Sequence, residues 1–285
     1  MGSLKKILLL AIPCAGVTAL SACGELVDPA LPPNAQALSP PPVYARWWAM
    51  TESCSGLSGD LASINWIEVP GAATFQFGSD LVNGYWSAAS NRIVLSEDAI
   101  LDGGVVRHEM LHALVRRRGH TRADFLTNCG GVVDCGAQCL DDAGPPAPLD
   151  ASVITVPGDS IVVGVEVDPE APKSTIDDGF FTIAVTARNP AAHRVFVQFL
   201  FGGTGIGWSF HYSMRGPLGE VIGGEPPLDP GIAIFAAGET KRQVFDFTIG
   251  GNRHPLTQSL ASGTYTVQGT FAGHSAVRAP VVVGP

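Results

Sequence analysis

Three residues within five consecutive positions have the types and the spacing that metal chemistry requires. His108, Glu109 and His112 belong to the stretch HEMLH. Residues four positions apart on an α-helix project from the same face, so the two imidazole rings could bind one divalent ion. Glu109 would lie beside them, where its carboxylate could accept a proton from a water molecule held at the ion. The stretch therefore predicts a metal site on a helix.

The surrounding residues predict the helix that must carry these side chains. A helical pattern extends over residues 105–118, and Gly119 follows where a left-handed residue commonly ends a helix. The opposite face is apolar and carries Val106, Met110, Ala113 and Leu114 at helical spacing. We therefore expect a helix that packs its back against a core and presents both histidines from a rigid support.

HEMLH matches every fixed position of the HExxH motif, and in this stretch the sequence resembles the zincin metallopeptidases. The resemblance implies that His108 and His112 bind Zn²⁺ and that Glu109 is the general base in the hydrolysis of a peptide or protein substrate. The competing interpretation is a helix with two incidental histidines, because short motifs also occur by chance. We expect the metal site because the predicted helix, the strand before it and an export signal all agree with it.

A catalytic zinc site needs a third protein ligand, and the sequence leaves its identity open. The metzincin branch places a histidine six residues after the second motif histidine, where this chain has Arg118. The gluzincin branch uses a later glutamate, but no glutamate occurs between positions 109 and 166. His120 is the first candidate, because a chain reversal after Gly119 could return its ring toward the metal. Asp124 is the second candidate.

A short apolar run before the predicted helix is typical of a strand. It occupies residues 91–96 and reads NRIVLS. In zincins, an edge strand at this place in the chain order binds an extended peptide by strand addition. By that resemblance, the residues expected to pair with the substrate backbone are Ile93, Val94, Leu95 and Ser96.

The N-terminal residues are typical of an export signal that ends at a lipidation site. Lys5 and Lys6 precede an apolar run, and the small-residue stretch LSAC follows at residues 20–23. Pro13 interrupts the run, which is shorter than the ~20 apolar residues that a membrane span requires. LSAC resembles the lipobox of bacterial lipoproteins, which implies that residues 1–22 are removed and that Cys23 carries the lipid. The expected location is the bacterial cell envelope, at the outer membrane or the periplasmic face if two membranes are present.

Further cysteines remain once Cys23 is lipidated and the signal peptide has been removed. They are Cys54, Cys129, Cys135 and Cys139. An even number in an exported protein indicates disulfides, which these residues could form in several connectivities. We favour Cys54–Cys129 and Cys135–Cys139, because the second pair is close in sequence and the first would join the start and end of one domain. The rival is a zinc cluster of the last three cysteines with His120, whose spacing matches no common zinc finger.

The formal net charge of -9 disfavours nucleic acid as a partner, because binding to phosphates requires clustered basic residues. A basic run does occur at residues 116–118. It lies in the last turn of the predicted helix, where the helix dipole favours cations. We therefore interpret this run as part of the helix end and expect no nucleic-acid partner.

Proline-rich segments divide the chain into two predicted domains. Residues 23–43 are expected to form a tether, and residues 141–149, DDAGPPAPL, a linker. Residues 44–140 predict a small α+β zincin-like domain, with a helix at 45–53 and strands at 63–69, 74–77 and 91–96. Residues 150–285 contain period-two apolar runs such as TYTVQGTF at 264–271, and they predict an all-β immunoglobulin-like sandwich.

The function that the sequence favours is zinc-dependent hydrolysis of peptide bonds by a lipid-anchored, exported metallopeptidase. The alternative is a non-catalytic cell-surface binding lipoprotein whose degenerate zincin domain holds metal. In either case, the lipid on Cys23 would contact the membrane. The C-terminal sandwich is a candidate for binding protein or glycan.

Overall fold

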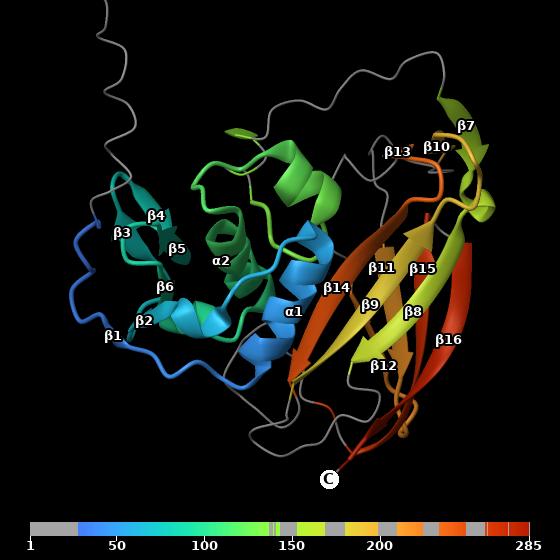
Figure 1. Cartoon of the computed structure of the whole chain (residues 1–285). Coiled ribbons are helices and arrows are strands. Elements are labelled where there is room, and N and C mark those ends of the chain that lie inside the picture. The colour runs from blue at the N-terminus through green and yellow to red at the C-terminus, as the bar shows by residue number, and fades with distance from the viewer. Residues whose placement is uncertain are drawn as a thin grey trace, which may run out of the picture.

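The structure, a computed structural model, describes residues 28–136, 139, 141–142, 153–168, 180–198, 210–224, 234–248, 260, 262–272 and 274–284. The predicted signal peptide, Cys23 and most of the predicted linker lie outside the described residues. Figure 1 shows helices and short strands in the N-terminal part of the chain and long strands in the C-terminal part. The fold is therefore mixed, and most of its described elements are strands in several small sheets.

The longer helical segments of the described chain all lie in the N-terminal part. They are α1 (Val43–Ser55), α2 (Gly103–Val115) and the π-helical segment η4 (Arg122–Asn128). Single 3-10 turns are η2 (Leu61–Ser63), η3 (Glu97–Ala99) and η5 (Gly158–Ser160). Helices α1 and α2 pack over one apolar core that includes Trp47 and Trp66. Val106, Met110 and Ala113 are buried in this core, so the apolar back predicted for the helix is confirmed.

A four-stranded sheet lies in the N-terminal part. Its order is β1 (Gln36–Ala37), β2 (Asn65–Val69), β6 (Arg92–Ser96) and β5 (Gly84–Ser87). Strands β2 and β6 are parallel, whereas β1 and β5 are antiparallel to their neighbours. Strands β3 (Phe75–Phe77) and β4 (Asp80–Val82) form a separate hairpin. The strands predicted at 63–69, 74–77 and 91–96 are all present, whereas β1, β4 and β5 had not been predicted.

The prediction that residues 93–96 form an edge strand was wrong. Strand β6 is paired on both sides, with β2 and with β5. Because both sides are paired, the backbone is not available to a substrate at the predicted residues, which are Ile93, Val94, Leu95 and Ser96. The run is continuously apolar because both faces of this central strand are buried. The end strand next to β6 is β5.

Part of the predicted tether is folded onto the N-terminal part. Strand β1 pairs with β2, and the Asp28 carboxylate accepts hydrogen bonds from the hydroxyl groups of Ser87 (2.6 Å) and Ser90 (3.0 Å). The proline content predicts a semi-extended tether, but one side of β2 offers backbone groups that β1 satisfies. At Asp28 and Gln36–Ala37 the segment predicted as a tether is therefore part of the N-terminal fold.

The C-terminal part consists of strands in three sheets. The first sheet has the order β14 (Thr240–Thr248), β9 (Phe180–Arg188), β8 (Val162–Asp168). The second has the order β12 (Val221–Gly224), β11 (Phe210–Arg215), β15 (Gly263–Phe271), β16 (His274–Val283). The third has the order β13 (Ile234–Phe235), β10 (Val195–Gln198), β7 (Ile154–Pro157).

One apolar core joins all three of these sheets. It includes Ile183 and Val185 of β9 together with Tyr265, Val267 and Phe271 of β15. The last three residues are buried, while Thr264 and Thr266 on the other face of the strand are exposed, so the alternation predicted from TYTVQGTF is confirmed. Burial of one face of each sheet is therefore what holds the C-terminal strands together.

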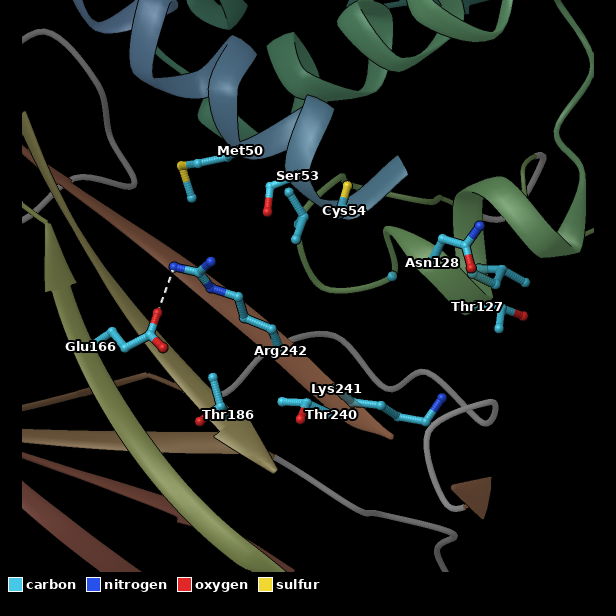
Figure 2. A pocket seen from close by; sticks show the side chains of 13 residues that line it. Met50, Ser53, Cys54, Thr127, Asn128, Glu166, Thr186, Thr240, Lys241 and Arg242 are labelled. Carbon is cyan, nitrogen blue, oxygen red and sulfur yellow. Dashed lines mark ion pairs between the residues drawn. The ribbon is translucent and has the colours of Figure 1, made fainter. Parts of the chain in front are cut away.

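The N-terminal and C-terminal parts are in direct contact. Val132 packs with Ala184 of β9 and Val244 of β14 in a small apolar cluster. Beside this cluster lies a cavity of about 310 Å³, between α1 and η4 on one side and strands β8, β9 and β14 on the other (Figure 2). Residues lining it include Met50, Thr127, Glu166, Thr186 and Arg242. Side-chain packing thus joins the two parts in addition to the chain itself.

The two predicted disulfides are both present, as Cys54–Cys129 and Cys135–Cys139. The first closes a sequence separation of 75 residues and the second a separation of 4. Disulfides persist in oxidising compartments, so they indicate an exported protein. Within the described ranges, no helix has both the length and the apolar character that crossing a membrane would require.

Replacing both Cys54 and Cys129 by alanine should destabilise the fold more than replacing both Cys135 and Cys139. Loop-closure entropy predicts a loss of about 4 kcal/mol for the long loop and about 2 kcal/mol for the short one. Chemical denaturation followed by circular dichroism measures the two free energies of unfolding. Equal losses would contradict the larger stabilising role of the long disulfide.

Candidate metal centre

The two ends of α2 determine how the motif residues are presented. At its start, the Asp102 carboxylate accepts a hydrogen bond from a backbone N–H of the first turn (3.1 Å), which is an N-cap. The helix ends at Val115, because Arg116 adopts a left-handed conformation with φ 56°. The predicted end at residue 118 was therefore too late. The early end reverses the chain before Gly119 and turns the carbonyl of residue 117 back toward the helix.

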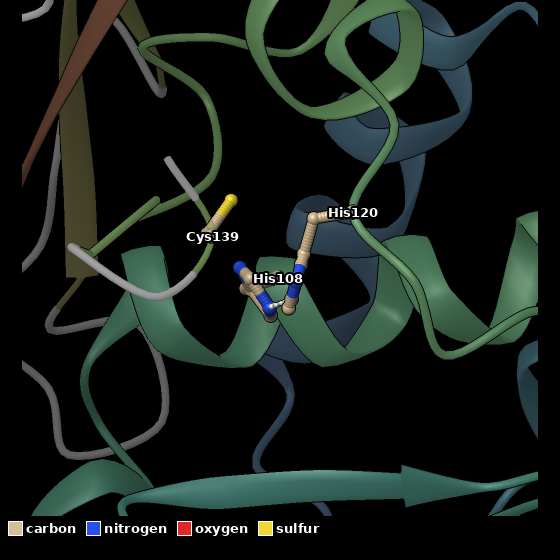
Figure 3. A group of neighbouring side chains, drawn as sticks. All are labelled: His108, His120 and Cys139. Atoms are coloured by element: carbon tan, nitrogen blue, oxygen red, sulfur yellow. Dashed lines mark hydrogen bonds between the residues drawn. The ribbon is translucent and has the colours of Figure 1, made fainter. Parts of the chain in front are cut away.

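Three imidazole rings meet beside α2. His108 and His112 lie one turn apart on the helix, and His120 comes from the loop that follows it. The distance between Nε2 atoms is 3.1 Å for His108 and His112, 3.1 Å for His108 and His120, and 3.2 Å for His112 and His120. Figure 3 shows the rings of His108 and His120 pointing toward one another. The structure thus brings together all three histidines that were predicted as ligands.

Backbone carbonyl groups fix the protonation of the two helical histidines. The Nδ1 atom of His108 lies 2.6 Å from the carbonyl oxygen of Asp134. The Nδ1 atom of His112 lies 2.8 Å from the carbonyl oxygen of Arg117. A carbonyl oxygen can only accept a hydrogen bond, so each Nδ1 must carry the proton. In the neutral rings, each Nε2 then has a free lone pair.

A carboxylate acts on the third ring in the same way. The Nδ1 of His120 lies 2.8 Å from the Asp142 carboxylate and donates to it, so in the neutral ring its Nε2 has a free lone pair as well. Three lone pairs that face one another cannot satisfy each other, because none of the three atoms is a donor. The three side chains could therefore hold a metal ion at the point where their lone pairs meet.

Burial keeps the helical histidines neutral. Desolvation and the neighbouring His120 lower the pKa of His108 from 6.5 to about 4. Desolvation and the neighbouring His108 lower the pKa of His112 well below its usual value. Neutral imidazole is the form that binds a metal ion, so no proton has to leave these two rings at neutral pH.

Phe125 of η4 supports all three rings from one side. It is 0% exposed, and its ring centroid lies 5.0 Å from that of His108, 4.7 Å from that of His112 and 4.9 Å from that of His120. Close packing against one aromatic ring restricts the rotation of the imidazoles. The three nitrogens are therefore held in place by packing as well as by hydrogen bonds.

Two other candidate residues are engaged elsewhere. The Asp124 carboxylate accepts a hydrogen bond from the Thr121 hydroxyl (2.6 Å) at the start of η4. The Sγ atom of Cys139 lies within 4.8 Å of ligand atoms of His108 and His120 (Figure 3), but it is part of the second disulfide. A disulfide sulfur is not the thiolate that binds a metal ion. With both disulfides formed, the rival prediction of a cysteine–histidine zinc cluster is wrong.

Glu109 lies beside the histidines in an apolar environment. It is 6% exposed, and burial raises the pKa of its carboxyl from 4.5 to about 8, while a hydrogen bond from the Trp86 backbone N–H opposes this shift. Gly84, also on β5, leaves room for it, because a side-chain carbon at that position would lie 3.3 Å from Glu109 Cγ. The Glu109 side chain is therefore placed between α2 and the end strand β5.

The residues that support the histidines were not predicted from the sequence. Asp134 and Arg117 act through backbone carbonyls, which every residue type has. Asp142 was assigned to the linker at 141–149, and its contact with His120 corrects that assignment at this position. No sequence signal distinguishes Asp142 from the other acidic residues that follow His120, because the contact depends on how the chain folds back.

No protein-family model matches this chain, and no curated protein matches it in sequence. Structures with partial similarity include an alkylpurine DNA glycosylase from Pseudomonas fluorescens (12% identity, TM-score 0.30) and β-glucosidases from Erythrobacter marinus (10%, 0.27) and Listeria innocua (15%, 0.26). Each alignment covers 44% of this chain, and 31%, 15% and 16% of those chains, respectively. This chain thus spans less than a third of their length. TM-scores this low carry no argument, so the functional interpretation rests on the site.

Replacing Asp142 by alanine should weaken metal binding, because the His120 ring loses the acceptor that orients it. Loss of such an outer partner typically lowers metal affinity by about 10- to 100-fold. Competition with a chromophoric Zn²⁺ chelator measures the dissociation constant of the purified protein.

Asp141→Ala is the matched control, because it removes the same charge from the neighbouring exposed position. We expect its Zn²⁺ affinity to equal that of the wild type. An Asp142→Ala protein that binds as tightly as the wild type would refute the role of Asp142.

Proposed function

We propose that this protein is a zinc-dependent hydrolase of peptide bonds, in which His108, His112 and His120 bind the ion and Glu109 is the general base. The observation that carries the proposal is the convergence of the three histidine Nε2 atoms on a helix that also carries the buried carboxyl group of Glu109, the residue next to His108. Catalytic zinc sites have three protein ligands and a fourth position for water or substrate, whereas structural sites use four protein ligands.

The distances between the Nε2 atoms support zinc as the ion. Zn–N bonds of about 2.0–2.1 Å in a tetrahedral arrangement place the ligand nitrogens about 3.3 Å apart. The separations in this protein are 3.1 and 3.2 Å. Three imidazoles also suit zinc better than Mg²⁺ or Ca²⁺, which prefer oxygen ligands. The residues present therefore fit the ion that the HExxH resemblance implies.

The chain's own residues supply the proton transfer. When bound, zinc lowers the pKa of a water molecule and polarises a carbonyl group. Glu109 accepts the proton of the attacking water and passes it to the leaving amine. Burial raises the pKa of Glu109 to about 8, but a positive charge nearby favours the carboxylate form that a base requires. The general base would therefore be formed as the ion binds.

The strand that would bind the substrate backbone in this proposal is β5. This strand ends the sheet order among the described strands, and the Trp86 N–H on it donates to Glu109. An extended peptide that adds to β5 as a further strand would lie beside the general base. The assignment takes the place of the one to β6, where both sides are already paired.

The finer assignments of fold and location belong to the same proposal. HEMLH and the adjoining mixed sheet support a zincin-like N-terminal domain, and two sheets around one core support an immunoglobulin-like C-terminal sandwich. LSAC supports a lipid on Cys23 and a location at the bacterial cell envelope. The C-terminal sheets are the candidate surface for binding protein or glycan.

Replacing Glu109 by glutamine should greatly slow turnover and leave zinc bound. Glutamine has nearly the same size but cannot accept the proton, and loss of a general base costs about 10²- to 10⁴-fold in rate. Digestion of a peptide library followed by mass spectrometry measures cleavage, and elemental analysis of the same sample measures zinc.

A chelator should stop cleavage by the wild-type protein, and added Zn²⁺ should restore it. Wild-type protein that holds zinc but cleaves no peptide would contradict hydrolysis and favour the non-catalytic binding lipoprotein. If the Glu109→Gln protein cleaved peptides at the wild-type rate, only the role of Glu109 as general base would be contradicted.

A further inference from the structure

An ion pair between a buried arginine and a partly buried aspartate joins the C-terminal part to the helix that carries the histidines. Arg107 precedes His108, is 2% exposed, and donates two hydrogen bonds to the Asp246 carboxylate, of 3.0 and 2.9 Å. Asp246 belongs to β14, 139 positions further along the chain. A bidentate pair between a guanidinium and a carboxylate fixes orientation as well as distance. The first half of α2 is therefore anchored to a strand of the C-terminal sheet.

The same strand also holds the loop that orients His108. The Nε of Arg107 donates to the Val132 carbonyl oxygen (2.5 Å), and the Val244 N–H of β14 donates to the carbonyl oxygen one residue earlier, at position 131 (2.8 Å). Further along this loop, Asp134 donates its backbone N–H to the start of α2 (3.0 Å) and accepts the hydrogen bond of His108. Strand β14 thus contacts both the helix and the loop that set the position of the His108 ring.

Glycines at two positions make this contact possible. A side-chain carbon at Gly103 would lie 2.5 Å from a carboxylate oxygen of Asp246. A side-chain carbon at Gly131, whose φ is 80°, would overlap the carbonyl oxygen of Arg242 on β14. A larger residue at position 131 would displace the backbone of β14, and one at position 103 would displace the side chains of the ion pair. The close approach is therefore a built feature of this chain.

Burial makes this ion pair sensitive to the loss of one partner. Without the Asp246 carboxylate, the Arg107 guanidinium would be a buried charge without a counter-charge, which is strongly unfavourable. The first half of α2 would then shift to expose the guanidinium to water, and His108 would move with it. An exposed ion pair has no such effect, because water screens the remaining charge.

We propose that Asp246 is a positioning residue of the metal centre, and that the C-terminal sheet thereby sets the geometry of the histidine ligands. The inference rests on the proposed zinc site. Asp246 acts through Arg107 and through the loop that Arg107 holds.

The test compares the Zn²⁺ dissociation constants of full-length mature protein with Asp246→Asn and with Glu166→Gln, measured by competition with a chromophoric chelator. Glu166 is the matched control, because it pairs with Arg242 of the same strand at 3.0 Å but is 60% exposed. We expect Asp246→Asn to weaken zinc binding by about 10- to 100-fold, as outer partners of metal ligands do. Glu166→Gln should bind as the wild type does.

Two measurements separate positioning from a purely structural role. A structural role predicts a lower unfolding temperature with unchanged zinc affinity of the folded protein, whereas positioning predicts weaker binding below the unfolding transition. Arg107→Gln and Asp246→Asn should each lower the zinc affinity. In the double variant the two fold-losses should not multiply, because both changes break the same contact. If Asp246→Asn does not fold, Asp246→Glu is compared with the wild type in its place, because it keeps the charge and moves the carboxylate.

The outcomes distinguish the two proposals. Wild-type protein that binds no zinc would overturn the proposed function. Wild-type protein that binds zinc, with equal affinity in the folded Asp246 variant, would overturn the positioning role and leave the proposed function intact.

Discussion

The convergence of three imidazole nitrogens is the constraint on which the site depends. Each Nδ1 is committed to a fixed acceptor, so each Nε2 lone pair is directed toward the same point. Lone pairs that face one another repel unless a cation lies between them. The three rings must therefore be held in place by contacts with the rest of the protein, and the free energy of those contacts comes from the fold as a whole.

The fold supplies these contacts in layers around the rings. Phe125 packs against all three imidazoles, and two carbonyls and one carboxylate hold the outer nitrogens. Further out, the Cys54–Cys129 disulfide ties the end of α1 to the end of η4, and Arg107 ties α2 to β14. The helix and the loops of the site are thus each attached to a different element. Such attachment limits the movement of the ligands relative to one another.

Expectations succeeded where they depended on neighbours in the chain. Spacing within one or two helical turns predicts that His108 and His112 share a face and that the back of α2 is apolar. The approach of His120 depends on a short loop that directly follows the helix. Expectations failed at sheet pairing. The apolar run of β6 was taken as an edge strand, and β1 as part of a tether, because periodicity shows which residues are buried but not which strands lie on either side.

By itself, the sequence determined the candidate ligand pair and the carboxylate beside it, because these depend on spacing along one helix. It favoured the cysteine pairing but left other connectivities open. Only the tertiary structure decided which acceptor holds each ring, which strand ends the sheet and that β14 supports α2. The reason is distance along the chain. Arg107 and Asp246 are 139 positions apart, and a contact at that separation leaves no periodic pattern by which either residue could be recognised.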